Sequence, residues 1–436
     1  MNLTDRQIIQ IALPSIVSNI TVPLLGLVDV TIVGHLGAAA YIGAIAVGGM
    51  LFNMIYWIFG FLRMGTSGLT AQAYGSKNAD EMLRTLYRSL FISILLAAAL
   101  IVLQWPIRLL AFLFIDGSEE VQALAATYFH ICIWGAPAVF GLYSFTGWFI
   151  GMQNSRYPMY IAIMQNVINI IASLLFVYGL EMKVEGVALG TVIAQYAGLF
   201  MAMALYWKHY HHTEHKRSLE FILEREAMKR FFVINRDIFL RTVCLVSVTV
   251  FFTSTGAAYG DVILAVNTIL MQLFTLFSYI MDGFAYAGEA LSGKDIGACN
   301  YKGLQQTVRH LFGWGIGMTV GFTLLYIAGG EGFLSLLTNE DEVIAASSEY
   351  FYWVLAIPIA GFAAFLYDGI CIGATATKIM LQAMIVAVAS FFVTYYLFQS
   401  DMGNHALWMS FIVYLFMRGF IQMLLTRSLI RGEKTE

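Results

Sequence analysis

The stretches GWFIG at residues 147–151 and GICIG at residues 369–373 stand 222 residues apart and share both glycines. The same offset relates Arg156 to Lys378. It also relates Leu69, Gly75, Asn78, Glu120, Val121, Ala123, Tyr128 and Phe129 to Leu291, Gly297, Asn300, Glu342, Val343, Ala345, Tyr350 and Phe351. One offset over three separated stretches indicates a duplicated chain. Duplicated helical membrane proteins place a binding site between their repeats and rock one half against the other, which points to a transporter.

The composition is that of a membrane protein. Hydrophobic residues make up 59% of the chain, charged residues only 12%, and the mean hydropathy is +0.75. A soluble domain carries about 25% charged residues. The net charge of −3 gives no indication of a nucleic-acid partner. The four cysteines lack CxxC spacing, which favours small buried side chains over a metal or disulfide framework. The N-terminus lacks the pattern of a cleaved signal peptide, so we expect the first helix to remain.

Apolar segments predict an all-α integral membrane fold of twelve helices in two six-helix repeats. We expect these helices at residues 8–33, 42–74, 85–113, 121–150, 156–180, 185–207, 233–256, 262–292, 303–334, 344–371, 375–397 and 405–430. Residues 1–207 then form an N-lobe, 208–232 a cytoplasmic linker and 233–436 a C-lobe with a short tail. All but three of the 24 Lys and Arg residues fall on one side or at its helix ends, the exceptions being Arg63, Arg108 and Lys183. This bias predicts that both termini lie in the cytoplasm.

We single out five ionisable side chains inside the expected spans, where such groups are costly and usually functional. They are Asp29, Arg63, Asp282, Glu289 and Asp368. Each also has a structural interpretation: Asp29 could lie among outer headgroups, Arg63 could neutralise a neighbouring acid, and the three C-lobe acids could fix helix packing.

None of these charges is duplicated at the offset, since Arg63 corresponds to Ala285, Asp282 to Gly60, Glu289 to Ser67 and Asp368 to Thr146. The divergence suggests specialised roles.

From the sequence alone, the ion that drives transport can be either H+ or Na+. A buried acid suits proton coupling because an apolar environment favours the protonated carboxyl, and Pro14 and Pro23 would let the first helix kink near Asp29. A sodium site would need converging oxygens. Asn166, Asn169 and Ser173 share one helix face, and Thr191 follows on the next helix. These polar groups could equally hydrogen-bond between helices.

The chain resembles the multidrug and toxic compound extrusion (MATE) family, and within it the DinF-like branch. The matching stretches are IALPSIVSNI, LVDVTIVGHLG, GFLRMGTSGLTAQAYG, NVINIIASLLFVYG, NRDIFLRT, MDGFAYAGEALSGKDIGA and DGICIGAT. The resemblance implies two lobes in a V around a central cavity, and an antiporter driven by H+ or Na+. It implies that Asp29 is the coupling acid, that Pro14 is the kinking proline, and that Asn169 and Thr191 belong to an N-lobe cation site. Relatives carry a second acid where this chain has Ser173, a departure that favours H+.

We therefore expect a membrane antiporter that exports organic cations or amphiphiles in exchange for H+ or Na+. Asp29, Asn169, Thr191 and Ser173 would form its ion-coupling site and Pro14 its conformational switch. Arg63, Asp282, Glu289 and Asp368 would belong to the substrate cavity or a charge network. We expect no cofactor and no metal centre, contact with membrane lipid, a monomer, and a place in a prokaryotic inner membrane.

Two alternatives remain at this stage. A lipid-like or endogenous amphiphilic substrate would make the protein flippase-like, although intramembrane Lys and Arg are scarce. A membrane-integral enzyme would need metal-ligand or nucleophile–base residues, and no such motif is found.

Overall fold

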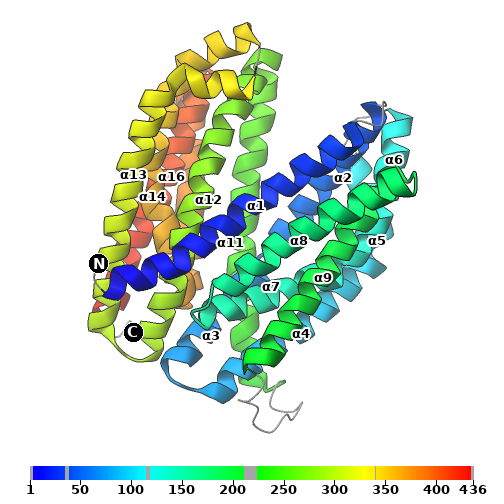
Figure 1. The fold of residues 1–436 in the computed structure, drawn as a ribbon. Helices are drawn as coiled ribbons and strands as arrows, with labels where there is room; N and C mark the ends of the chain where they lie inside the picture. The colour runs from blue at the N-terminus through cyan, green and yellow to red at the C-terminus, as the bar shows by residue number, and fades with distance from the viewer. Residues whose placement is uncertain (1–2, 35–38, 114–117, 211–222, 339, 434–436) are drawn as a thin grey trace. The chain divides into compact units, whose positions relative to one another are not determined.

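The computed structural model describes residues 3–34, 39–113, 118–210, 223–338 and 340–433, which form helices and no strand (Figure 1). Their bounds in the first half are α1 Leu3–Gly34, α2 Ala39–Ile58, α3 Phe61–Gly75, α4 Ala79–Val102, α5 Gln104–Leu113, α6 Glu119–Cys132, a 3₁₀ turn Ile133–Gly135, α7 Ala136–Gly151, α8 Arg156–Leu174, a π turn Leu175–Gly179 and α9 Val184–Tyr210. The second half contains α11 Arg225–Ala258, α12 Asp261–Gly297, α13 Tyr301–Leu337, α14 Asp341–Gly373, α15 Thr377–Met402 and α16 Asn404–Arg431.

Eleven helical segments of the described residues are long and apolar enough to cross a membrane. The 32-residue α1 covers the first predicted span, residues 8–33. The predicted all-α membrane fold is thus confirmed. Three predicted helices are each divided in two: 42–74 into α2 and α3, 85–113 into α4 and α5, and 121–150 into α6 and α7. Pro106 is the third residue of the short α5, and Pro137 is the second residue of α7. The N–H groups in the first turn of a helix have no partner within the helix. A proline there therefore removes no helical hydrogen bond, and a new helix can start at little cost in free energy.

Residue contacts divide the chain into two compact units. We call residues 17–231 the N-terminal unit, and residues 232–436 together with 1–16 the C-terminal unit. Helix α1 therefore contributes its first turns to one unit and its remainder to the other. The lobe limits expected from the sequence, 1–207 and 233–436, stay a prediction, and residues 211–222 of the expected linker lie outside the described residues.

The repeat persists at the level of helix ends. Leu3, Ala39, Ala79 and Glu119 begin helices, and so do Arg225, Asp261, Tyr301 and Asp341, each 222 residues later. Backbone conformations repeat as well: the residues with positive φ include the pairs Lys77 and Cys299, Gln153 and Thr375, and Glu181 and Gly403. The first two pairs end helices in the left-handed conformation that lets the next N–H reach back five residues. The offset therefore holds without a gap from one end of the repeat to the other.

The helix N-caps repeat too. The Asn78 side chain accepts a hydrogen bond from the Glu81 N–H at 3.0 Å, and the Asn300 side chain accepts one from the Gly303 N–H at 3.0 Å. Each amide oxygen pairs an N–H that the first turn of a helix leaves without a partner.

The glycines of GWFIG and GICIG hold the same helix crossing in each unit. In the N-terminal unit α7 crosses α3, and a Cβ added at Gly147 or Gly151 would overlap the carbonyl oxygen of Arg63 or Ser67. In the C-terminal unit α14 crosses α12, and a Cβ at Gly369 or Gly373 would overlap the carbonyl oxygen of Ala285 or Glu289. The contacted residues are themselves 222 apart. Small residues at such crossings let two backbones approach, which drives helix association in membranes.

This crossing makes a stability prediction. Gly147→Ala and Gly369→Ala would force a methyl group against backbone that has no side chain to move aside, and we expect each to destabilise the protein by about 1–3 kcal/mol. Gly317→Ala and Gly321→Ala on α13 are matched controls, because nothing lies within 4 Å of an added Cβ there. These controls should leave the melting temperature in detergent unchanged or slightly raised. Equal melting temperatures for all four variants would contradict the prediction.

Candidate ion-coupling site in the N-terminal unit

Asp29 lies inside the N-terminal unit, near the C-terminal end of α1. Its side chain is 5% exposed, and its Oδ1 has no hydrogen-bond partner among the described residues. The carboxyl group also interacts with the Thr191 hydroxyl of α9. An isolated buried carboxylate is costly, so the site favours a bound proton or a cation at this group.

Helices α8 and α9 bring three further polar side chains to this place. The Asn169 Nδ2 donates to the Thr191 Oγ1 at 3.0 Å, and that hydroxyl reaches the Val187 carbonyl oxygen at 3.0 Å. Gly190, beside Thr191, packs directly on the Ser173 backbone and hydroxyl. The two helices approach closely because residue 190 has no side chain. Asp29, Asn169 and Thr191 therefore lie together in the structure, and their role as an ion-coupling site stays a prediction.

Unpaired oxygens are a second property of this group. The Asn169 Oδ1 and the Ser173 Oγ are buried and, like the Asp29 Oδ1, have no partner in the part of the chain that the structure describes. Most buried polar side-chain atoms in proteins are hydrogen-bonded, so three such oxygens in one region call for an explanation. All three oxygens can accept hydrogen bonds or coordinate hard cations, and the carboxylate of Asp29 can also take up a proton.

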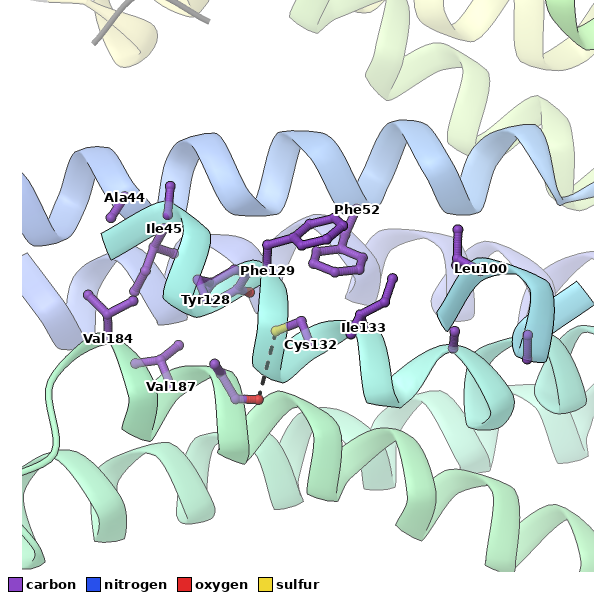
Figure 2. Packing of buried hydrophobic residues seen from close by; sticks show 14 of the residues in the cluster. Ala44, Ile45, Phe52, Leu100, Tyr128, Phe129, Cys132, Ile133, Val184 and Val187 are labelled. Atoms are coloured by element: carbon purple, nitrogen blue, oxygen red, sulfur yellow. Dashed lines mark hydrogen bonds between the residues drawn. The ribbon is translucent and has the colours of Figure 1, made fainter. Parts of the chain in front are cut away.

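Tyr128 and Cys132 of α6 border the same site, and the sequence did not indicate either. The Asp29 charge acts on both side chains, and the Tyr128 hydroxyl lies within hydrogen-bonding range of Thr191. Figure 2 shows Tyr128 and Cys132 packed among apolar residues of α2, α6 and α9, with the Cys132 thiol directed at the Ala188 carbonyl oxygen at 3.9 Å. These neighbours exclude water from one side of the carboxyl. Tyr128 and Tyr350 are equivalent residues of the two repeats, 222 residues apart. This shared tyrosine is the sequence feature that could have marked Tyr128 as a candidate.

The C-terminal unit holds a different charged cluster. Asp368 of α14 accepts hydrogen bonds from Arg241 of α11 and Arg418 of α16, and its Oδ1 accepts one from the Gln422 Nε2 at 2.6 Å. All four side chains are buried. Sequence analysis found Asp368 but assigned both arginines to cytoplasmic helix ends. Arg418 and Gln422 are four residues apart in the predicted span 405–430, a spacing that places them on one helix face.

The other predicted charges are distributed as follows. Arg63 and Glu289 are buried at the two repeated crossings, where their carbonyl groups meet Gly147 and Gly373. Asp282 is partly buried, and its charge acts on Arg418. Pro14 is buried in α1, two residues before the contacts of that helix change from one unit to the other. Their functional roles stay predictions.

Comparison with known proteins identifies the family. The MatE family profile matches residues 14–175 and 238–397, one segment in each half. The chain belongs to the MatE family. It is 38% identical over 416 residues to DNA damage-inducible protein F of Escherichia coli (strain K12), covering 95% of this chain and 90% of that protein. It is 24% identical over 392 residues to Protein DETOXIFICATION 44, chloroplastic, of Arabidopsis thaliana, covering 87% and 74%.

Solved structures agree on the fold. A MATE protein in its bent conformation matches with a TM-score of 0.86 at 17% identity, over 99% of this chain and 96% of that one. The Vibrio cholerae MATE transporter VcmN in the bent form matches with a TM-score of 0.87 at 16% identity, over 99% and 98%. The DinF-like resemblance and the MATE-like fold are confirmed. The MatE chain is a multi-pass membrane transporter of the multidrug and toxic compound efflux type, not an enzyme.

The Asp368 cluster makes a prediction about stability. Asp368→Asn would leave Arg241 and Arg418 buried without their counter-charge, and removing one partner of a buried ion pair costs about 3–5 kcal/mol. We expect a lower melting temperature in detergent than for Asp341→Asn, an exposed acid in the first turn of the same helix. Adding Arg418→Gln to Asp368→Asn should recover part of the loss, because one uncompensated charge disappears. Strictly additive losses in the double variant would contradict a coupled cluster.

Proposed function

We propose that this MatE transporter exports organic cations or amphiphiles in exchange for H+, and that Asp29 is the carboxylate that couples the two. The observation that carries the proposal is the buried Asp29 carboxyl with one oxygen unpartnered among the described residues, beside Asn169 and Thr191. Na+ is the rival ion. No group of three or more His, Cys, Asp or Glu residues is placed to hold a metal ion within the described chain. A site with one acid suits a proton better than a tightly held Na+.

The Thr191 hydroxyl supplies a chemical link between the charge on Asp29 and the helices around it. The hydroxyl has one proton, which it can donate to the Val187 carbonyl or to Asp29, and its oxygen already accepts from Asn169. A charged carboxylate attracts that proton more strongly than a neutral carboxyl does. Protonation of Asp29 would therefore return the hydroxyl to Val187 and change the contacts between α1, α8 and α9.

Pro14 would let α1 respond to this change. Proline has no N–H to donate, so one backbone hydrogen bond of the helix is lost and bending there is cheap. Because the contacts of α1 pass to the other compact unit just after Pro14, bending at this residue would couple the Asp29 site to alternating access. Arg63, Asp282 and Glu289 remain proposed members of the substrate cavity or charge network. We place the transporter in a prokaryotic inner membrane as a monomer, with both termini in the cytoplasm.

The experiment that tests the proposal is dye transport in proteoliposomes with ΔpH and a Na+ gradient imposed separately. Wild type should move ethidium under ΔpH alone, and Asp29→Asn should lose this transport because its amide cannot take up the coupling proton. Glu349→Gln, an exposed acid on α14, is the control and should transport normally. ΔpH-driven transport at wild-type rate in Asp29→Asn would rule out the mechanism. Absence of ethidium transport in wild type would favour a lipid-like substrate instead.

A second variant tests the choice of ion. Ser173→Asp would place a second carboxylate beside Asn169, on the face where the unpaired oxygens lie, and would add the negative charge that a Na+ site needs. We expect Na+ to stimulate ethidium transport by Ser173→Asp at least severalfold more than transport by wild type. Ser173→Asn adds similar volume without the charge and should not respond. Strong Na+ stimulation of wild type itself would reverse the assignment of the ion.

A further inference from the structure

The two repeats exchange the beginnings of their first helices. Residues 3–16 of α1 belong to the C-terminal unit, and residues 225–231 of α11 belong to the N-terminal unit. Residues 225–231 are the equivalents of residues 3–9 in the repeat. Each unit therefore holds the start of a helix whose remainder belongs to the other unit. The contacts that fix these starts decide whether a movement of one unit is passed along the helix to the other.

The start of α11 is held largely by apolar packing. The Phe231 side chain is 1% exposed and lies in the apolar core of the N-terminal unit, and Met228 packs against that core. The Arg230 Nη2 also donates a hydrogen bond to the Gln72 Oε1 of α3 at 2.9 Å.

The start of α1 is held by a charged hydrogen-bonding group as well. The Asp5 Oδ1 accepts hydrogen bonds from the His310 Nδ1 at 2.9 Å and from the Trp314 Nε1 at 3.1 Å, both on α13. Figure 1 shows the N-terminus beside α13. A carboxylate can only accept, so both rings act as donors, and hydrogen bonds to a charged acceptor are stronger than neutral ones. We call Asp5, His310 and Trp314 the α1 anchor.

Helix α12 supports the α1 anchor. The Trp314 ring stacks on the Phe284 ring of α12 with centroids 6.2 Å apart. A Cβ added at the neighbouring Gly283 would overlap the Ile16 side chain and the Ala12 carbonyl oxygen of α1. The first turns of α1 are thus fixed at two points, by α13 near the N-terminus and by α12 three turns later.

The α1 anchor is not duplicated with the scaffold. The positions equivalent to its three members hold Ala227, Arg88 and Ile92. Arg88 pairs with Glu81 of its own helix at 2.7 Å. The anchored helix is also the one that carries Asp29, so the anchor is found in the repeat where a response to the ion has to be transmitted.

We propose that Asp5, held by His310 and Trp314, is a positioning residue for transport, because it keeps the first turns of α1 on the C-terminal unit while Asp29 takes up or releases the proton. The inference rests on the proposed function and adds the fixed point against which α1 moves. Without that point, a change at Asp29 would displace the start of α1 and leave the C-terminal unit where it was.

Hydrogen exchange measured by mass spectrometry tests the α1 anchor without transport. Asp5→Ala removes two hydrogen bonds to a charged group, so exchange of the backbone amides of residues 7–16 should become about tenfold or more faster. Exchange in residues 17–34 should stay the same. Asp80→Ala is the matched control, because it removes an exposed acid from the first turn of α4, and it should leave exchange in α1 unchanged. Equal exchange in wild type and Asp5→Ala would overturn the inference.

Transport of ethidium tests the consequence. Asp5→Ala should lower kcat about tenfold or more and leave KM and ethidium binding nearly unchanged, because the Asp29 site is intact. Asp5→Glu should recover part of the loss. Trp314→Phe keeps the ring and removes only the N–H, so its effect should be smaller, and adding it to Asp5→Ala should lower kcat no further.

The outcomes separate this inference from the proposed function. Wild-type kcat in Asp5→Ala would overturn the inference, and so would loss of ethidium binding together with transport, which would assign Asp5 to folding alone. If wild type shows no flux driven by ΔpH, the proposed function fails, and the hydrogen-exchange result still decides whether Asp5 anchors α1.

Discussion

Close contact between helix backbones at four glycines is the constraint on which both units depend. Gly147 and Gly151 seat α7 on the carbonyl groups of α3, and Gly369 and Gly373 seat α14 on those of α12. Lipid supplies no hydrophobic driving force between helices, so close packing of this kind has to hold the unit together. These crossings fix how the helices pack in each unit, and residues on the other helix faces can therefore differ between the two repeats.

Function arises where the two copies differ. At one set of equivalent positions the N-terminal unit has Asp29 with Asn169 and Thr191. The C-terminal unit has the Phe251 ring there, packed edge to face against the Phe391 and Tyr395 rings. At another set the C-terminal unit has Asp368 between two arginines, where the N-terminal unit has Thr146. One acid lacks a partner for one of its oxygens among the described residues, and the other is compensated. This asymmetry suits a transporter in which one half responds to the ion while the other keeps a fixed charge cluster.

The fold and half of the site could be predicted from the sequence. The helices and the repeat could be predicted because apolar runs and glycine spacings are local features of the sequence. Asn169 and Ser173 could be placed on one helix face because they are four residues apart. Arg241 and Arg418 were misplaced because a charge count along the chain cannot tell a helix end in water from a buried residue a few positions further in. Tyr128 and Cys132 were missed because the sequence does not distinguish a residue that only packs in an apolar core from one that also borders a buried carboxyl group. Pro106 and Pro137 were the available sequence signals for the breaks before α5 and α7, and the predicted spans 85–113 and 121–150 did not use them.

The central claim is that Asp29 exchanges a proton for the substrate cation. The most direct test is to count protons released into weakly buffered solution when purified protein in detergent binds ethidium. The account predicts release that approaches one proton per bound dye in wild type, at a pH where Asp29 is protonated, and none in Asp29→Asn. Release that persists in Asp29→Asn, or that reaches two protons per dye in wild type, would contradict it.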